Sequence, residues 1–129
     1  MRMPGLELMI GLAAATLACR GSRSLPRYAE AIGGDAERGR SLVAARHCGA
    51  CHAIPRIAGA DGVIGPPLAG FARRSFIGGR APNTPQNLTR WIRNPHDLDP
   101  ATAMPAVGLD QTQALDVASY LYTLDEGSR

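Results

Sequence analysis

Two cysteines and a histidine stand within five consecutive residues, Cys48-Gly49-Ala50-Cys51-His52. Each thiol can add to one vinyl group of a porphyrin, and the histidine that follows can ligate the iron of that ring. This C-x-x-C-H spacing is typical of covalent c-type haem attachment. The motif therefore predicts one haem c, bound through Cys48 and Cys51, with His52 as an axial ligand of the iron.

Two other kinds of chemistry use the same residue types. A structural zinc site needs four ligands, usually from a second Cys/His pair, and no such pair follows His52. A redox-active cysteine pair is expected beside a βαβ pattern, and the sequence around the motif lacks the alternation that predicts strands. We therefore favour haem attachment over a zinc half-site or a thioredoxin-like pair.

The second axial ligand should come from a distant part of the chain, on the opposite side of the porphyrin. Met104 is the only methionine beyond the N-terminal segment, and it lies in a loop made stiff by Pro105. A lone methionine is more often a core residue, but Met104 is not on an apolar helical face, which favours a role as ligand. His96, in a polar turn, and His47, next to the motif, are the weaker candidates.

The N-terminus resembles a bacterial export signal over residues 1–18. Arg2 supplies the positive start, and residues 8–17 are uncharged and mostly apolar. Ala18-Cys19 resembles a lipoprotein processing site, which predicts that Cys19 is lipidated; a plain secretory signal cut nearby is the alternative. We expect a periplasmic or extracytoplasmic protein that is tethered to the membrane through Cys19.

Residues 19–34 are polar and contain glycines, so we expect a flexible linker there and a folded domain over residues 35–129. Each helix expected in that domain begins at a capping signal. The three helices span 36–46 after Asp35, 85–94 after Thr84 and before Pro95, and 112–124 after Asp110 or Thr112.

Apolar side chains share one face of the second and third helices. They are Leu88, Trp91 and Ile92, and then Ala114, Val117, Ala118, Leu121 and Tyr122. Residues 53–83, in contrast, are rich in glycine and proline and predict a long irregular stretch. Because loops of that length in a compact domain usually serve function, we expect this stretch to wrap a cofactor.

The net charge of +3 hides an uneven distribution along the chain. Residues 35–96 carry nine arginines and three acids, whereas residues 97–126 carry six acids and no base. Such a dipolar chain suits steering toward redox partners with acidic docking surfaces, although fortuitous segregation on a solvated surface gives the same pattern. Nucleic acid is excluded as a partner, since there is no lysine and no basic stripe with aromatic residues.

The chain resembles the class I cytochrome c family over residues 35–125. The features that carry the resemblance occur in the family's order: Gly39 and Val43, the Cys48–His52 motif, Gly65-Pro66-Pro67-Leu68, Trp91, Met104-Pro105, and Tyr120 with Leu121. The resemblance implies an all-α fold of three to four short helices, with long loops that wrap one covalently bound haem. It also implies that Gly39 lies where the first and last helices cross.

Two further roles follow from the resemblance alone. The Pro66 carbonyl is expected to accept a hydrogen bond from His52, which would fix the imidazole. Trp91 is expected near a haem propionate, with plain core packing as the alternative. The implied cofactor-binding residues are thus Cys48, Cys51, His52, Pro66, Trp91 and Met104, with His52 and Met104 on the iron.

Because histidine and methionine would fill both axial positions, the iron would have no open site for a substrate. We therefore expect a monohaem electron carrier between respiratory or periplasmic partners, not an enzyme. The main alternative is the haem c subunit of a larger membrane oxidoreductase, such as an oxidase or dehydrogenase. A haem-based sensor or peroxidase-like module is a third hypothesis and requires a labile Met104.

Overall fold

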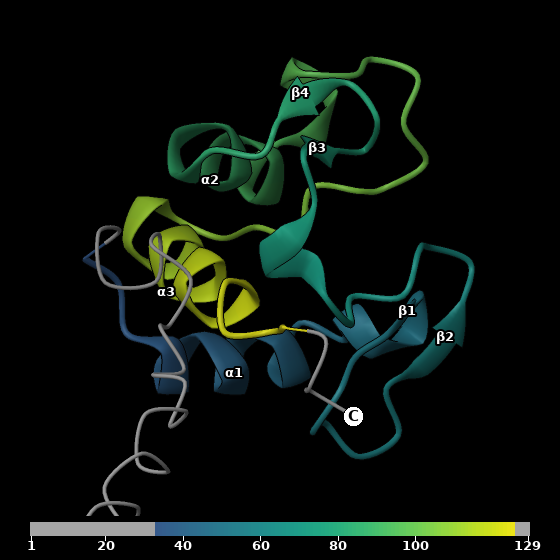
Figure 1. Cartoon of the computed structure of the whole chain (residues 1–129), viewed down its shortest axis with the longest axis vertical. Coiled ribbons are helices and arrows are strands. Elements are labelled where there is room, and N and C mark those ends of the chain that lie inside the picture. The colour runs from purple at the N-terminus through teal and green to yellow at the C-terminus, as the bar shows by residue number, and fades with distance from the viewer. Residues whose placement is uncertain (1–32, 126–129) are drawn as a thin grey trace, which may run out of the picture.

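The computed structural model describes residues 33–125, in which three α-helices are arranged around a small core (Figure 1). The helices are α1 (Ala36–Ala45), α2 (Pro85–Arg93) and α3 (Gln111–Leu121). They confirm the three expected helices, although α3 ends at Leu121 rather than at residue 124. The expected export signal (1–18), Cys19 and the linker as far as residue 32 lie outside the described residues.

Side-chain caps fix where the helices begin. Asp35 accepts hydrogen bonds from two backbone N–H groups of α1, and Thr84 accepts one from the backbone of α2. At α3 the cap is Asp110 rather than Thr112, because Asp110 forms a reciprocal capping box with Gln113. Each cap satisfies N–H groups that have no partner within their own helix.

Helices α1 and α3 pack directly against each other at Gly39, which is buried in the middle of α1. A Cβ atom at residue 39 would lie 1.9 Å from the backbone oxygen of Asp116 in α3. Only glycine permits so close an approach of the two backbones. This confirms the expected place of Gly39 at the helix crossing.

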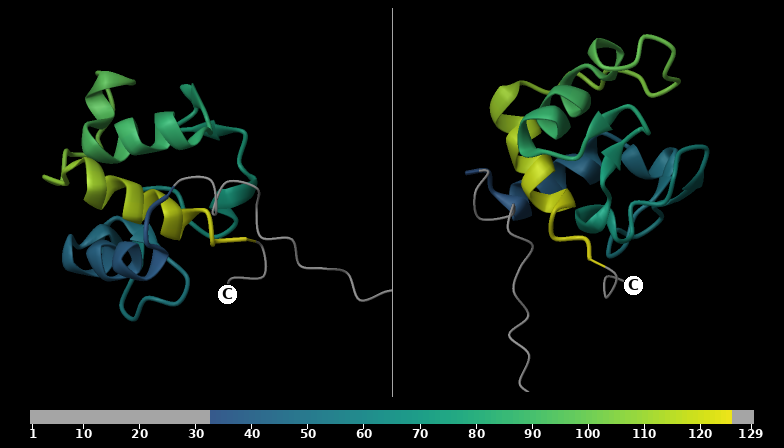
Figure 2. Two further views of the ribbon diagram at one scale, coloured as in Figure 1. Left: turned by 90° about the vertical axis from the view of Figure 1, so that its left-hand side faces the viewer. Right: turned by 45° about the horizontal axis from the view of Figure 1, so that its top comes forward.

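The prediction of one irregular stretch over residues 53–83 is wrong in part, because two small antiparallel pairs of strands form around and within it. Strands β1 (His52–Ala53) and β2 (Asp61–Val63) make the first pair, and β3 (Phe76–Ile77) and β4 (Ala81–Pro82) make the second. Strands this short show no alternation in the sequence. The fold remains mainly helical. The β1–β2 pair lies beside the end of α1, and the β3–β4 pair lies beside α2 at the opposite end of the molecule (Figures 1 and 2).

The core is built around α3, which packs against α1, including the buried Val43, and against α2. The apolar faces predicted for α2 and α3 are buried. Tyr122, just beyond α3, is fully buried, and its hydroxyl lies 2.7 Å from Oδ1 of Asn83. Asn83 in turn donates to the backbone oxygens of Phe71 and Arg74. This network fixes the loop before β3 against the end of α3. Within residues 33–125, no helix is long and apolar enough to cross a membrane.

Candidate haem-binding site

The Cys48–His52 motif follows α1 directly and is held in a tight turn. Residues Cys48–Ala50 form a single 3₁₀ turn, and the N–H of Cys51 lies 3.2 Å from the Cys48 oxygen. His47, immediately before it, adopts a left-handed backbone conformation with φ of 56° and turns the chain away from α1. Both thiols are free and half-buried. The turn thus brings two unpaired thiols close together beside β1.

Burial raises the pKa of the Cys48 thiol, and the neighbouring Cys51 acts in the same direction. Redox-active cysteine pairs depend on a thiol whose pKa is lowered by nearby positive charge or a helix N-terminus. Cys48 has the opposite environment, which argues against the thioredoxin-like alternative. Nor do residues 33–125 contain a group of three or more His, Cys, Asp or Glu side chains placed to hold a metal ion.

The His52 ring is fixed by two neighbours. Its Nδ1 lies 2.8 Å from the backbone oxygen of Pro66, the partner that the family resemblance implied. Because a carbonyl oxygen can only accept, Nδ1 carries the proton and Nε2 keeps a free lone pair. A Cβ atom at Gly65 would lie 2.4 Å from Cε1 of His52, so the absence of a side chain at Gly65 makes room for the ring. This arrangement presents one nitrogen for a metal.

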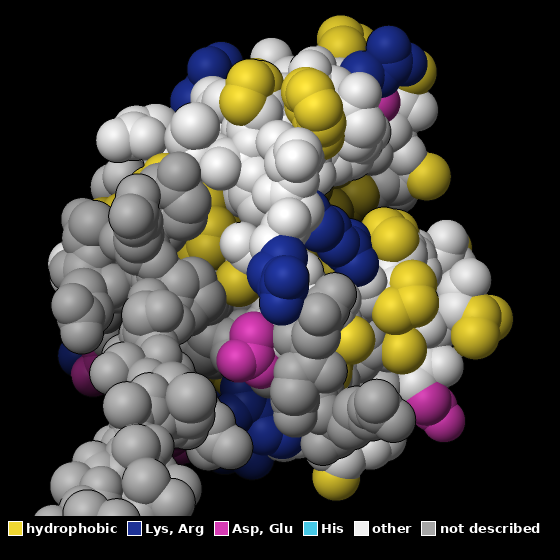
Figure 3. All heavy atoms as spheres, in the orientation of Figure 1, with side chains coloured by type: hydrophobic (Ala, Val, Ile, Leu, Met, Phe, Trp, Pro, Cys, Tyr) yellow, Lys and Arg dark blue, Asp and Glu magenta, His cyan; other side chains and the backbone are white. Residues whose placement is uncertain are grey.

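Apolar side chains lie uncovered beside His52. Val63 is paired with His52 across the β1–β2 ladder, and the side chains of Val63 and Ile64 are 91% and 78% exposed. Apolar side chains gather on the side of the molecule that carries β1 and β2 (Figure 3). Two thiols, an imidazole nitrogen and an adjacent apolar surface are what a covalent porphyrin requires, so this set of residues fits a haem.

Met104 and Trp91 are brought together in a second part of the site. Met104 lies in the segment between α2 and α3, which projects to the same side of the molecule as β1 and β2 (Figures 1 and 2). The indole Nε1 of Trp91 lies 3.1 Å from the sulfur of Met104. Trp91 belongs to the buried core, and its N–H is engaged by a thioether. Its expected place beside a haem propionate stays a prediction.

The competing histidines differ from His52 in their surroundings. His47 and His96 are both exposed, and His96 lies in the short 3₁₀ turn Pro95–Asp97. Within residues 33–125, neither ring has a hydrogen-bond partner that orients it as Pro66 orients that of His52. Met104, in contrast, is partly buried and packs against the core. The structure therefore favours His52 and Met104 over the other two as ligand candidates.

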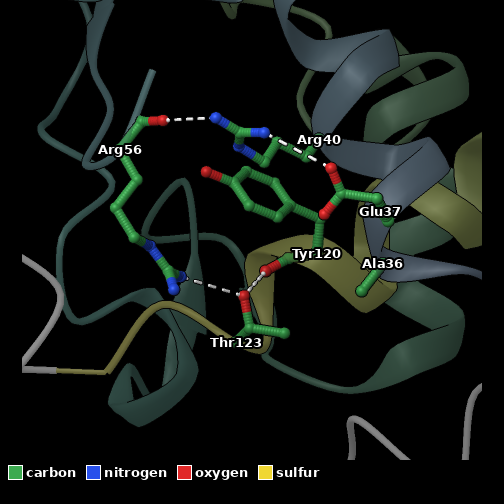
Figure 4. A pocket seen from close by; sticks show the side chains of 6 residues that line it. All are labelled: Ala36, Glu37, Arg40, Arg56, Tyr120 and Thr123. Atoms are coloured by element: carbon green, nitrogen blue, oxygen red, sulfur yellow. Dashed lines mark hydrogen bonds and ion pairs between the residues drawn. The ribbon is translucent and has the colours of Figure 1, made fainter. Parts of the chain in front are cut away.

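A separate surface cavity of about 330 Å³ lies between α1, the loop after β1 and the end of α3 (Figure 4). Its polar groups are bonded mainly to one another: Arg40 donates to Glu37 and to the backbone oxygen of Arg56, and Arg56 donates to Thr123. The Tyr120 hydroxyl donates to the oxygen of Pro55, and burial raises the pKa of Tyr120. The cavity contains none of the expected haem-binding residues.

Two residues near the site were not singled out from the sequence. Gly78 packs against the Trp91 ring, and the Gly78-Gly79 pair was an available signal for a tight turn. Val63 is exposed beside His52, but a single apolar residue in a loop gives no such signal. Gly78 contacts Trp91 and Val63 pairs with His52, and in each case the two residues lie in different segments of the chain.

Comparison with known proteins agrees with this geometry. The family model described as "Cytochrome c" matches residues 36–125. A curated relative, cytochrome c oxidase subunit 2 of Alkalihalophilus pseudofirmus, is 35% identical over 71 residues, which is 55% of this chain and 20% of the relative. The chain thus spans about a fifth of that protein's length. No solved structure matches the chain.

The family match covers most of the chain and includes the C-x-x-C-H motif, the Pro66 region and Met104. Within this match, Cys48 and Cys51 have the spacing that attaches haem c. The chain therefore belongs to the cytochrome c family, with a covalently bound haem c as its cofactor.

Proposed function

We propose that this protein is a monohaem electron carrier in which His52 and Met104 are the axial ligands of the haem iron. The proposal rests on one observation: hydrogen bonds to neighbouring residues orient two side chains that can ligate iron, His52 and Met104. Nε2 of His52 is left free by the bond to Pro66, and the sulfur of Met104 is held by Trp91. When bound, the haem supplies an iron that changes its charge by one electron.

The residues of the chain define what that iron can do. The Pro66 carbonyl fixes the imidazole and makes Nε2 more basic, as outer-sphere partners of metal ligands do. A thioether is a neutral, soft donor, and His/Met ligation raises the reduction potential. If both ligands bind the iron, neither axial position is open to a substrate, so electron transfer is the activity that this ligation would support.

The excess of arginines supports transient binding of partners with acidic docking surfaces, although some arginines are paired with groups of the same domain. Arg80 pairs with Asp99 at 3.4 Å, and the guanidinium of Arg74 lies over the Phe71 ring and donates to the Pro67 oxygen. Arg38 and Arg40 are also ion-paired, with Asp35, Asp116 and Glu37. The first half of the domain nevertheless keeps more arginines than acids, and this net positive charge would steer such partners.

A second candidate is a haem c subunit of a larger membrane oxidoreductase. The observation that favours it is the relative named as a subunit of cytochrome c oxidase, within which the matching region is a fifth of the chain. Stable co-purification with other subunits from detergent-solubilised membranes would support this candidate, whereas isolation as a single chain supports a free carrier.

We further propose that the domain is exported and attached to the outer face of the cytoplasmic membrane through lipidated Cys19. The proposal rests on the apolar run before Ala18-Cys19 and on the linker that follows it. Mass spectrometry of the protein purified from membranes tests it: a diacylglyceryl group on an N-terminal Cys19 is expected. A Cys19→Ser variant that remains in the membrane fraction would contradict the anchor.

The axial ligands are tested by spectra of the haem-loaded protein, oxidised and reduced, with and without carbon monoxide. His52/Met104 ligation predicts a low-spin spectrum with a weak near-infrared sulfur-to-iron band in the ferric state and no change with carbon monoxide. A high-spin ferrous form that binds carbon monoxide would contradict the carrier and favour a sensor or peroxidase-like function.

A further inference from the structure

The surface cavity of about 330 Å³ carries more positive than negative charge (Figure 4). Arg40 and Arg56 contribute two guanidinium groups to its lining, and Glu37 contributes one carboxylate. We call it the Arg40–Arg56 cavity. Its volume lies at the lower end of the range of small-molecule sites, which is about 300–1,000 Å³. A polar lining with an excess of positive charge indicates an anion as the ligand.

Arg56 supplies a positive charge that no carboxylate neutralises. Within residues 33–125 it forms no ion pair, and the partner of its guanidinium is the neutral hydroxyl of Thr123, at 3.3 Å. Hydrogen bonds from a guanidinium to an anion are shorter, about 2.7–2.9 Å. Most N–H groups of Arg56 therefore make no hydrogen bond within the described part of the chain and can donate to a ligand.

Arg40 is only partly neutralised. Its bond to Glu37 is 3.3 Å long, and the side chains of Arg40 and Glu37 are 47% and 80% exposed. Because an ion pair so open to water contributes little, an anion in the cavity can compete with Glu37 for this guanidinium. Arg40 also donates to the backbone oxygen of Arg56 at 3.0 Å, so the two arginines are joined directly.

The backbone of Arg56 is held in a conformation that side chains rarely adopt. Its φ is 64°, in the left-handed region. Such a residue is strained and persists only where its surroundings hold it, and ligand-binding segments are common among such places. Here Arg40 holds the Arg56 oxygen, and the Tyr120 hydroxyl holds the oxygen of Pro55 at 3.1 Å. The side chain of Arg56 consequently runs along the cavity from Arg40 toward Thr123 (Figure 4).

The hydroxyl of Tyr120 reports the field inside the cavity. Burial is the main influence on its pKa and raises it, whereas the charges of Arg56 and Arg40 lower it and that of Glu37 raises it. Both guanidinium charges therefore reach the same point in the cavity, from α1 and from the loop after β1. Their combined field favours a negatively charged group there.

We propose that the Arg40–Arg56 cavity binds a phosphate monoester group or inorganic phosphate, with Arg40 and Arg56 as the donors. One guanidinium fork is sufficient for a planar carboxylate, whereas a tetrahedral phosphate presents oxygens in several directions and carries more charge, which two forks can share. The phosphate belongs either to a soluble ion or ester or to a lipid headgroup. This inference does not depend on which residues ligate the iron, because the cavity contains none of those candidates.

Titration of the reduced, haem-loaded protein with inorganic phosphate tests the proposal. Chloride replaces phosphate at constant ionic strength, calorimetry gives the affinity, and the NMR signals of the Arg56 and Thr123 amides show where the ion binds. Arg56→Gln removes one of the two donors. Arg90→Gln is the matched control, because it removes the same charge from an exposed position of α2 outside the cavity.

We expect the wild type and Arg90→Gln to bind phosphate equally and to show shifts of both amide signals. Arg56→Gln should bind at least about tenfold more weakly, since it loses charged hydrogen bonds. Equal weakening in the two variants, or the same shifts with chloride, would overturn the proposal. If Arg56→Gln does not fold, Arg56→Gly removes the guanidinium and suits the left-handed backbone, and the same loss of binding is expected.

Vesicles distinguish the two sources of the phosphate. Phosphatidylcholine vesicles receive either phosphatidic acid, which exposes a phosphate monoester, or phosphatidylglycerol, which does not, at equal total charge. A preference for phosphatidic acid that Arg56→Gln abolishes and Arg90→Gln keeps would assign the site to a lipid headgroup. Binding of inorganic phosphate without that preference would assign it to a soluble ion or ester. Binding of neither would show that the cavity is not a phosphate site.

Discussion

Arg38 in α1 and Asp116 in α3 bind each other through two hydrogen bonds, from Nε at 2.9 Å and from Nη2 at 3.0 Å. The same carboxylate accepts the backbone N–H of Asp35 at 2.7 Å. Asp116 is almost completely buried, at 3% exposure, whereas the Arg38 side chain remains largely open to solvent. A buried carboxylate with three donors thus joins the start of α1 to the middle of α3.

This arrangement predicts how stability depends on pH. The hydrogen bond from Arg38 holds the pKa of Asp116 below its ordinary value of 3.8. Because the unfolded chain then binds the proton more readily than the folded protein, the stabilisation is fully present above that value. It is lost as the pH falls through the lower pKa of the folded state. Urea unfolding of the haem-loaded protein should therefore show this loss beginning as the pH falls below about 4 and continuing toward pH 2.

Asp116→Asn should abolish that part of the pH dependence and cost about 1–3 kcal/mol at neutral pH, because the donors lose a charged acceptor. Glu37→Gln is the control: Glu37 is exposed and its ion pair with Arg40 at 3.3 Å lies on the surface, where such pairs contribute little. An Asp116→Asn variant with wild-type acid sensitivity would show that other groups govern it.

Gly39→Ala should destabilise the domain although alanine is the better helix former. Alanine would contribute about 1 kcal/mol of helix propensity, but its Cβ would overlap the Asp116 backbone, and overpacking costs about 1–3 kcal/mol or more. We expect net destabilisation in urea unfolding. Ser41→Ala, on the exposed side of the same helix, should change the free energy of unfolding by no more than about 0.5 kcal/mol. Equal stability of Gly39→Ala and wild type would mean that α1 and α3 can move apart freely.

The sequence predicted the helices well because their signals are local. Asp35, Thr84 and Asp110 each cap a helix within their own few residues, and Pro85 starts α2 in its first turn. Gly39 within α1 was informative for a similar reason. Glycine is a poor helix former, so its place in the middle of a helix indicates a close contact with another element. Such features need no knowledge of the rest of the fold.

Contacts between distant segments were harder to predict. Strands of two or three residues, such as β1 and β3, are too short for any alternation. The bond from Trp91 to Met104 joins a helix to a loop with no pattern in their spacing, and Gly78 acts on Trp91 from yet another segment. These relationships depend on tertiary packing, which the chain's periodicity does not encode.

Gly65→Ala should disturb the haem ligand directly. A Cβ atom there would lie 2.4 to 2.9 Å from three atoms of the His52 ring, so the imidazole must turn and weaken its bond to Pro66. We expect a lower yield of haem-loaded protein and a changed reduction potential in what remains, measured by haem staining and by potentiometric titration. A variant with wild-type yield and potential would show that the ring is not held as the structure has it.

The two proposed ligands should respond differently to removal. His52→Ala should prevent a stable haem-loaded protein, whereas Met104→Ala should retain covalent haem, bind carbon monoxide and have a lower reduction potential. Absorbance with and without carbon monoxide, together with potentiometric titration, distinguishes the two. An unchanged potential in Met104→Ala would mean that Met104 is not the ligand and would favour His96 in its place. Normal axial ligation in His52→Ala would contradict the assignment of His52.

The arginine-rich surface should make electron exchange depend on salt in a way that reveals the sign of the local charge. Oxidation of the reduced protein by anionic ferricyanide should slow as salt is added, because ions screen the attraction. Reduction of the oxidised protein by cationic hexaammineruthenium(II) should become faster for the same reason. Arg80→Gln removes one positive charge and leaves Asp99 without its cation, so it should slow the ferricyanide reaction several-fold at low salt. It should have no effect near 1 M salt, where the screening length is about 3 Å. Arg40→Gln, on α1 at another part of the surface, is the control. Rates that are independent of salt for both reagents would show that these charges do not steer charged partners.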